Sequence, residues 1–322
     1  MNEKDPERPF DVIVVGELNV DLIFDGLDGK FPEKGKEILA REMTLTLGSS
    51  SAIFASNLST LGVSVSFTGR VGKDSYADLV LGSLEQKGVD TSGILVSAGE
   101  VTGVTVAFSY GEERAMVTHS GAMEHLTLDD ISPERLEQGR HMHLSSAFLQ
   151  KGLKPDLVRL FRMAREAGMT TSFDPQWDPD EAWDIDMEEF LPQVDLFLPN
   201  LEEIKHLTRT RSLEEALFAV KGKARVVVVK DGSRGAFLQS DDLRLHRPVF
   251  RNPRVVDTIW AGDSFNAGFI SGFVNGASLD QCLRLGTLAG AVNTCRPGGT
   301  GAFADLQTAR TIARDTFNEA LS

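Results

Sequence analysis

Three things are scarce in this sequence: cysteine, positive charge and long apolar runs. Cys282 and Cys295 are the two cysteines among 322 residues, and without a CxxC pair they offer neither a disulfide framework nor a cysteine-based zinc site. Acidic residues outnumber basic ones by 47 to 33, and the formal net charge of -14 disfavours binding to nucleic acid. No stretch reaches the roughly 18 apolar residues of a membrane span and no signal peptide is recognisable, so we expect a cytoplasmic protein without a membrane partner.

Several catalytic motifs are missing as well. The sequence has no Gly-x-x-x-x-Gly-Lys phosphate loop, no His-Glu-x-x-His pair and no Gly-x-Ser-x-Gly elbow, which removes the commonest competing enzyme classes. His141 and His143 alternate along one predicted strand, but no third ligand stands at a recognisable spacing. We interpret these histidines as structural or substrate-facing residues rather than metal ligands.

What the sequence does contain is an alternation of short apolar runs with helical patterns. The β-branched runs at 12–15 and 226–229 are typical of strands that are buried on both faces. Helical patterns that close near a glycine or a polar break span residues 52–61, 76–86, 153–167 and 201–207. This alternation predicts βαβ units in a three-layer α/β/α sandwich with a mainly parallel central sheet.

Two segments break this rhythm. Residues 22–47 and 101–118 alternate apolar and polar side chains around turns at Asp28-Gly29 and Gly111-Glu112, the pattern of half-exposed antiparallel strands. We expect a small β lid on a single domain of residues 1–322, since no linker divides the chain. Exposed lid strands can pair between subunits, so a homodimer through the lid is an alternative to a monomer.

The stretch from Asp257 to Gly268, DTIWAGDSFNAG, carries the strongest chemical signal. The small residues Ala261 and Gly262 let the backbone approach a ligand, and the free N–H groups at a helix start favour an anion. An aspartate at this point, Asp263, can accept a proton from an attacking hydroxyl group. Taken alone, Asp263 is more simply interpreted as a helix N-cap.

This stretch resembles the C-terminal signature of the ribokinase-like (PfkB) carbohydrate kinases, Asp-Thr-x-(Gly/Ala)-Ala-Gly-Asp. The resemblance implies ATP-dependent phosphorylation of a hydroxyl group of a sugar or sugar-like molecule, with Asp263 as the catalytic base and ATP and Mg²⁺ bound. The backbone amides of Ala261, Gly262 and Asp263 would form the anion hole. Trp260 stands in that hole where the family has glycine or alanine, and its side chain either points outward or narrows the entrance.

The N-terminal part resembles the acceptor side of the same family. The motif GELNVD contains Asn19 and ends in Asp21, which corresponds to the aspartate that binds substrate hydroxyls. Residues 48–62 resemble the substrate helix, where Gly48, Ser49 and Ile53 occupy the substrate-binding positions. Ile53 replaces an asparagine that hydrogen-bonds the sugar, so we do not expect a ribokinase as such.

The resemblance also assigns the nucleotide and the metal. Asn200 and Glu203 match the Asn-x-x-Glu element that organises magnesium, largely through water, and Lys230 lies in a turn similar to the nucleotide-binding turn. The other nucleotide-binding residues implied are Asn200, Gly232, Gly235, Gly262 and Asn293, and a monovalent-cation site for K⁺ would use Asp257 and Ile259.

Three alternatives stay open on the sequence. A nucleoside kinase of this fold would need stacking aromatic side chains near the lid, and a sugar-phosphate kinase would need cations there. The aromatic candidates are Phe24, Phe31, Phe54, Phe108 and Tyr110, and the cationic candidates are Lys36, Arg41 and Arg114. The third alternative is a non-catalytic sugar- or nucleotide-binding relative, which would have no reason to retain a base together with a metal-organising pair.

Overall fold

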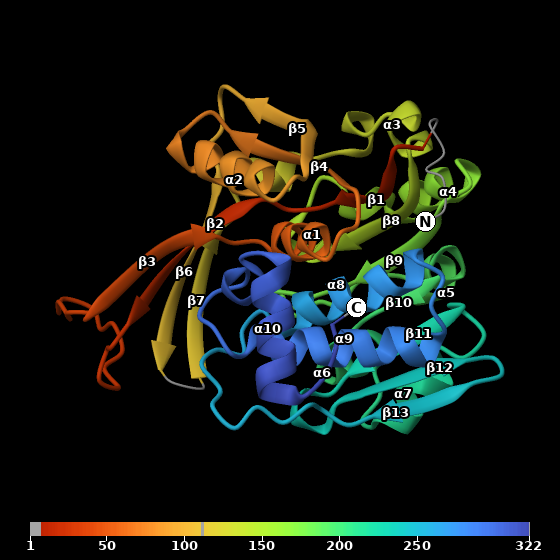
Figure 1. The fold of residues 1–322 in the computed structure, drawn as a ribbon. Coiled ribbons are helices and arrows are strands. Elements are labelled where there is room, and N and C mark those ends of the chain that lie inside the picture. Colours follow the sequence, from red (N-terminus) through yellow and green to blue (C-terminus); the bar gives the residue numbers. More distant parts are fainter. Residues whose placement is uncertain (1–7, 111–112, 322) are drawn as a thin grey trace.

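The computed structural model describes residues 8–110 and 113–321, which form a large sheet between two layers of helices and a smaller sheet beside it (Figure 1). The large sheet has nine strands in the order β13-β12-β11-β10-β9-β8-β1-β4-β5. Its strands are β1 (Phe10–Val15), β4 (Val65–Gly72), β5 (Asp90–Ser97), β8 (Gly139–Ser145), β9 (Thr170–Asp174), β10 (Leu196–Phe197), β11 (Val226–Lys230), β12 (Ala236–Ser240) and β13 (Arg244–Arg247). All neighbouring pairs from β5 to β11 are parallel, and β12 and β13 extend the sheet with antiparallel pairs.

Helices cover both faces of this sheet because its strands are apolar on both sides. Ile13 and Val15 of β1 belong to one core cluster, and Val12 and Val14 belong to the other. The first cluster packs against α3 (Pro133–Glu137), α4 (Leu157–Glu166), α5 (Met187–Phe190), α6 (Leu201–Thr208) and α7 (Leu213–Ala219). The second packs against α1 (Ser50–Thr60), α2 (Ser75–Gln86), α8 (Ala261–Val274) and α9 (Leu279–Asn293), and α10 (Leu306–Phe317) packs on α9. The predicted three-layer fold is therefore confirmed.

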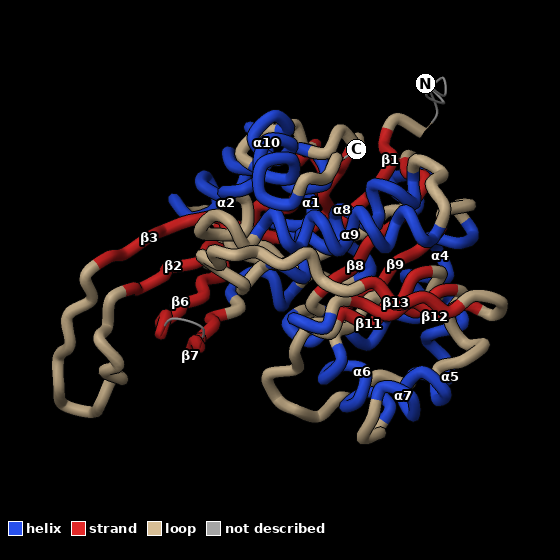
Figure 2. Tube along the Cα trace, turned by 60° about the horizontal axis from the view of Figure 1, so that its bottom comes forward, coloured by secondary structure: helices blue, strands red, loops and turns tan. Residues whose placement is uncertain are grey.

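The smaller sheet has four strands in the order β3-β2-β6-β7 and projects from the body of the molecule (Figure 2). Its strands are β2 (Asn19–Asp25), β3 (Glu42–Leu47), β6 (Gly103–Tyr110) and β7 (Glu113–His119). The lid is defined here as these four strands. β2 follows β1 and β6 follows β5, so both central lid strands leave the large sheet on the same side.

Four local expectations need correction or restriction. The central lid pair, β2 with β6, is parallel rather than antiparallel, because both strands enter the lid from the same edge of the large sheet. Asp28-Gly29 is a turn within a long connection between β2 and β3, not a tight hairpin. The helix expected from residue 153 starts at Leu157, after a 3₁₀ turn that contains Pro155. The predicted turn Gly111-Glu112 lies outside the described residues.

Within the part of the chain that the structure describes, no helix is long and apolar enough to cross a membrane.

Candidate active site

Polar and charged side chains gather at one edge of the large sheet, where its parallel strands end. The order of the strands places β1 beside β8 at the centre, and the chain runs outward from this pair in both directions. In open α/β sheets, ligands bind outside the carboxyl ends of the strands at such a switch point. The residues that end or follow a strand at this edge are Glu17, Ser145, Asp174, Asn200 and Lys230.

A buried charge pair forms the centre of this edge. The Nζ atom of Lys230 lies 2.6 Å from Oδ2 of Asp174, and the Asp174 side chain is fully buried. Asn266 of α8 donates from Nδ2 to the same Oδ2 at 2.5 Å. The second carboxylate oxygen of Asp174, Oδ1, is buried and has no hydrogen-bond partner among the described residues. Such an atom is a free acceptor for a bound ligand, water or metal ion.

Asp263 lies in the first turn of α8 and reaches the same cluster. Gln176 donates from Nε2 to Oδ1 of Asp263 at 2.9 Å and to Oδ2 of Asp174 at 3.1 Å. Burial raises the pKa of Asp263 to about 8, the nearby Asp174 adds to the rise and Lys230 opposes it. A carboxyl group with such a pKa is a stronger base than an ordinary aspartate, as a proton acceptor near neutral pH must be. Asp263 is not the N-cap of α8, because that position is Trp260.

The start of α8 has the features of an anion site. No side chain caps the helix at Trp260, so the first N–H groups of α8 are not satisfied by a capping side chain. Ala261 and Gly262 are half-buried rather than enclosed. A Cβ added at Gly262 would lie 3.8 Å from Nζ of Lys230, so the cation sits close to the same helix start. The helix dipole and Lys230 together favour a phosphate group here.

Asn200 and Glu203 meet at the start of α6. They form a reciprocal capping box, in which the Asn200 backbone N–H donates to Oε2 of Glu203 at 2.8 Å and the Asn200 side chain accepts from the Glu203 N–H at 2.9 Å. Burial raises the pKa of Glu203 to about 8, and Asp174 adds to the rise. Asn200 and Glu203 therefore cap the start of α6, and the Glu203 carboxyl group is also close enough to Asp174 for their charges to interact.

The acceptor side predicted from the N-terminal motif is assembled on the lid. Asn19 of β2 donates from Nδ2 to Thr105 Oγ1 of β6 at 2.7 Å and to Asp21 Oδ1 at 3.3 Å. Gly48 passes so close that an added Cβ would lie 2.2 Å from Asp21 Oδ1, so a larger residue there would displace the Asp21 side chain. Asn19 and Asp21 are both buried.

Ser49 and Ile53 shape the start of α1 in different ways. Ser49 is the N-cap of α1, with a left-handed φ of 70°, and its Oγ donates to the carbonyl oxygen of Glu17 at 2.6 Å. Ile53 is fully buried and packs in a small cluster with Trp260 and with Ile23 of the lid. Trp260 is only 6% exposed, so of the two placements left open by the sequence its side chain does not take the outward one. The two residues that depart from the family pattern are neighbours in space.

The residues assigned to the nucleotide and the potassium ion organise the connections around α8. Asp257 accepts from the N–H groups of Ile259 at 2.9 Å and Gly298 at 3.1 Å. Asn293 is fully buried and donates to the Gly299 carbonyl at 2.9 Å, which holds the following loop in place. These contacts hold the segment before α8 and the 298–299 loop together.

The turn after β11 contains the two remaining glycines. Gly232 is exposed, with a φ of 51°, whereas Gly235 is buried and an added Cβ there would lie 2.0 Å from the Arg247 carbonyl. Close packing against β13 therefore requires glycine at Gly235 whatever else the residue does.

The histidines on β8 belong to the core. His141 and His143 are fully buried. Nε2 of His141 and Nδ1 of His143 each form a hydrogen bond of 2.7 Å with Ser172 Oγ. Burial lowers the pKa of His141 to about 3 and places the pKa of His143 well below its usual value, so both rings are neutral. Their structural interpretation is confirmed.

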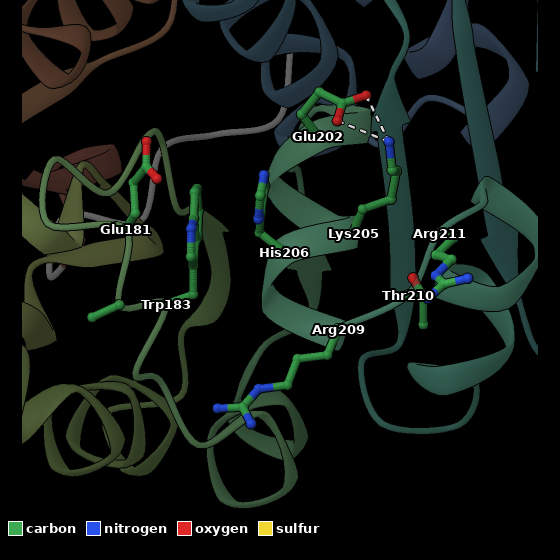
Figure 3. A pocket seen from close by; sticks show the side chains of 9 residues that line it. Glu181, Trp183, Glu202, Lys205, His206, Arg209, Thr210 and Arg211 are labelled. Carbon is green, nitrogen blue, oxygen red and sulfur yellow. Dashed lines mark hydrogen bonds and ion pairs between the residues drawn. The ribbon is translucent and has the colours of Figure 1, made fainter.

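An open pocket of about 500 Å³ lies on the outer face of α6 (Figure 3). The rings of Trp183 and His206 stack there at 4.9 Å, and Lys205 pairs with Glu202. Glu203 is buried and is not among the residues that line this pocket. This pocket is therefore separate from the charge cluster.

Comparison with known proteins decides the family. Residues 10–305 match the pfkB family of carbohydrate kinases. The chain belongs to this family. It is 30% identical over 293 residues to an ATP-dependent ribose-1-phosphate kinase of Halopiger xanaduensis, a match that covers 90% of this chain and 94% of the relative. The predicted enzyme class is confirmed: the chain is an ATP-dependent sugar kinase, a phosphotransferase with an alcohol group as acceptor.

Solved structures agree on the fold of this pfkB-family kinase. Arabidopsis thaliana ribokinase, solved with ribose and ATP, gives a TM-score of 0.80 at 23% identity and covers 95% of this chain and 99% of its own. A putative ribokinase II of E. coli, solved with ATP and Mg²⁺, gives a TM-score of 0.80 at 22% identity with the same coverage. At these identities the similarity establishes the ribokinase fold alone.

Several residues of the charge cluster were not singled out from the sequence. Gln176, Asn266, Glu17 and Asp174 had no assigned role. Glu17 is buried, accepts from the Ser51 N–H at 3.2 Å, and burial raises its pKa. The available signal was position: Glu17 and Asp174 are acidic residues directly at the end of apolar strands, where function concentrates in α/β sheets.

Proposed function

We propose that Asp263 is the general base in the transfer of the γ-phosphoryl group of ATP to a hydroxyl group of an uncharged sugar. The observation that carries this proposal is the placement of Asp263 at the uncapped start of α8, buried, with a pKa raised to about 8 and within hydrogen-bond reach of Gln176. A base at this point stands beside the anion site and not within it. The sugar and the phosphate would therefore meet at the start of α8.

In this mechanism Asp21 and Asn19 hold the sugar hydroxyls. Asp263 takes the proton of one hydroxyl as its oxygen attacks the γ-phosphorus, and the bond to the bridging oxygen of ADP breaks. The backbone N–H groups of Ala261, Gly262 and Asp263 stabilise the negative charge on the phosphoryl oxygens. The proton then leaves Asp263 to solvent when the product departs.

The residues at the end of β10 fit a sparse magnesium site. Glu203 and Asn200 provide oxygens near the cluster, and Oδ1 of Asp174 is an acceptor without a partner in the described chain. No group of three or more His, Cys, Asp or Glu side chains in the described ranges is arranged to hold a metal, which suits an ion that keeps several waters. When bound, Mg²⁺ would neutralise phosphate charge. A potassium site at Asp257 and Ile259 rests on the family resemblance.

The cationic candidates for a phosphorylated acceptor are occupied elsewhere. Lys36 forms an ion pair with Glu33 and Arg41 forms one with Asp28, and both cations are largely exposed. Charges that are already paired and solvated contribute little to binding a phosphate. The side chain of Arg114 lies outside the described part of the chain. These pairings favour an uncharged sugar over a sugar phosphate.

The aromatic candidates for a nucleoside are also paired. Phe24 stacks with Phe108 at 6.0 Å, and the strand alternation puts both on the lid face opposite Asp21. Phe31 stacks with Tyr110 at 6.0 Å. Phe54 is buried in the body. None of these five rings, as described, stands beside Asp21, which weakens the nucleoside alternative.

The test is ADP formation from ATP and Mg²⁺ with a panel of sugars, sugar phosphates and nucleosides, comparing the wild type with Asp263→Asn. Loss of a general base lowers kcat by about 10²–10⁴-fold, with KM for ATP little changed. Asp78→Asn is a matched control, because Asp78 also lies in the first turn of a helix but is exposed. Retention of most of the rate by Asp263→Asn would overturn the assignment.

We also propose that two copies pair through the lid. One face of the lid is apolar across all four strands, and the paired positions on it include Phe24 with Met43, Leu22 with Leu45, and Val106 with Val117. Met43, Leu45 and Val117 are 59%, 40% and 66% exposed. A contiguous apolar sheet face with open edges at β3 and β7 is a typical protein contact.

A further inference from the structure

Trp260 joins the start of α8 to the lid. Its ring packs in one buried cluster with Ile53 of α1, Ile23 of β2 and Ala107 of β6. Ile23 and Ala107 are directly paired in the β2–β6 register, one step along the same face from the pair Asp21 and Thr105. The lid face that carries the acceptor aspartate is therefore polar at Asp21 and apolar immediately beyond it.

The polar part of this lid face contains one buried atom that lacks a hydrogen-bond partner in the described chain. Asn19 is 4% exposed, and its Oδ1 atom is buried without a hydrogen-bond partner among the residues described. Its Nδ2 atom is used by Thr105 and Asp21. A buried carbonyl oxygen of this kind needs a donor, and a sugar hydroxyl supplies one.

The apolar part of this face offers no hydrogen-bond acceptor to a sugar hydroxyl. Ile53 is fully buried, and it is held between Trp260 and the 298–299 loop, where an added Cβ at Gly299 would lie 2.4 Å from its Cδ1 atom. Trp260, Ile23 and Ala107 present only carbon on this side, apart from the indole N–H. A ligand hydroxyl directed at this wall would lose its hydration without a replacement, at a cost of about 1–3 kcal/mol.

We infer that Trp260 and Ile53 are specificity-determining residues, which form an apolar wall next to the polar positions of Asp21 and Asn19. This inference rests on the proposed function for the location of the acceptor. The wall selects a sugar whose hydroxyl groups meet Asp21 and Asn19 and whose neighbouring carbon, against the wall, is a deoxy carbon. Because an apolar pocket rejects an added hydroxyl only moderately, the preference for a deoxy sugar over its hydroxylated parent should be about 10–100-fold in kcat/KM.

Binding can be followed at Trp260 itself, independently of catalysis. The sequence has 3 tryptophans, so replacing Trp177 and Trp183 by phenylalanine leaves Trp260 as the only indole. With Asp263→Asn added to prevent turnover, the emission of Trp260 is titrated with 2-deoxy-D-ribose and D-ribose, and with 2-deoxy-D-glucose, 6-deoxy-D-glucose and D-glucose. The expected result is a change in Trp260 emission that saturates at lower concentration for a deoxy sugar than for its parent.

Three substitutions at Ile53 test the wall in the active enzyme. Ile53→Asn restores an amide and should bring the deoxy and parent sugars close to parity in kcat/KM. Ile53→Thr is smaller than isoleucine, adds a single hydroxyl, and provides the same comparison if the asparagine variant does not fold. Ile53→Val has the shape of threonine but keeps the wall apolar, so it should keep the preference.

The outcomes separate the inference from the proposed function. A deoxy preference at Trp260 without ADP formation by the wild type would support the wall and overturn the proposed phosphotransfer. ADP formation with no deoxy preference in any sugar pair, or no response of Trp260 to any sugar, would overturn the wall. A preference that Ile53→Thr leaves unchanged would remove Ile53 from the assignment.

Discussion

Gln176 joins the two buried carboxylates of the site: its Nε2 atom donates to Asp263 Oδ1 at 2.9 Å and to Asp174 Oδ2 at 3.1 Å. Gln176 adopts a left-handed φ of 58°, which residues other than glycine rarely do. Backbone strain of this kind persists where the surroundings hold it in place. Gln176 thus positions the Asp263 carboxylate and stabilises its ionised form.

Removal of this amide should change the pH dependence of the reaction. A hydrogen bond to a carboxylate favours the charged form, so Gln176→Ala should raise the pKa of Asp263 further above its usual range. The general base must be ionised to act, so the variant should lose about tenfold in kcat/KM at neutral pH and recover toward wild type at alkaline pH. The measurement is kcat/KM against pH. Gln239→Ala is a control, because that amide bonds the Leu217 carbonyl far from Asp263; an unshifted profile in Gln176→Ala would remove the positioning role.

Much of the fold and part of the site follow from the sequence for a local reason. Apolar runs that end in a charged residue place Lys230 at a strand end, and the signature at 257–268 places Asp263 at a helix start. The resemblance to the carbohydrate kinases adds Asn200 and Glu203. All four lie around one buried cluster because parallel strands deliver their carboxyl ends to one edge.

The remainder depends on contacts between distant segments. Gln176 and Asp263 are separated by 87 positions, and Asn266 and Asp174 by 92, so no local pattern indicates either bond. β2 and β6 pair in parallel although β3, α1, β4, α2 and β5 lie between them in the sequence. The alternation of apolar and polar side chains indicates only that each of the two segments is half-buried, not which strand it pairs with. The contact between Trp260 and Ile53 is likewise invisible to a residue-by-residue comparison with the family.

Gly48→Ala should impair the acceptor side selectively. An added Cβ would lie 2.2 Å from Asp21 Oδ1 and 2.9 Å from Asn19 Oδ1, so these side-chain ends must move away. Because they are the ends of side chains, the fold should survive, while KM for the sugar should rise about 10–100-fold and the affinity for ATP should stay unchanged. Sugar and ATP kinetics measure both. Gly82→Ala is the control, since Gly82 lies inside α2 with no atom within 4 Å of the new Cβ; equal effects on sugar and ATP would contradict this account.

Val117→Glu should separate the proposed lid dimer. Val117 is 66% exposed on the apolar lid face, and a buried glutamate without a partner opposes association by several kcal/mol. Light scattering after size exclusion should show a dimer for the wild type and a monomer for this variant. Thr118→Glu is the control: Thr118 lies on the opposite face of the lid by alternation, so a charge there should weaken association less than Val117→Glu does. A wild-type monomer at micromolar concentration would refute the dimer.

The raised pKa values also predict how stability depends on pH. Burial raises the pKa of Glu203 from 4.5 to about 8, so between these values the folded chain holds a proton that the unfolded chain has released. The contribution of Glu203 to the unfolding free energy is therefore fully present below pH 4.5 and is lost as the pH rises to about 8, with a limiting slope of about -1.4 kcal/mol per pH unit.

Glu203→Gln should flatten this slope, because glutamine does not titrate. Chemical denaturation of the ligand-free protein at several values between pH 5 and pH 9 measures the unfolding free energy, and the variant should differ from wild type mainly in its dependence on pH. Glu202→Gln is the matched control: Glu202 lies next to Glu203 on α6, is exposed and pairs with Lys205. If both variants change the slope equally, the carboxyl group of Glu203 is not held protonated by burial beside Asp174, and the electrostatic basis for placing phosphate chemistry at this edge would weaken with it.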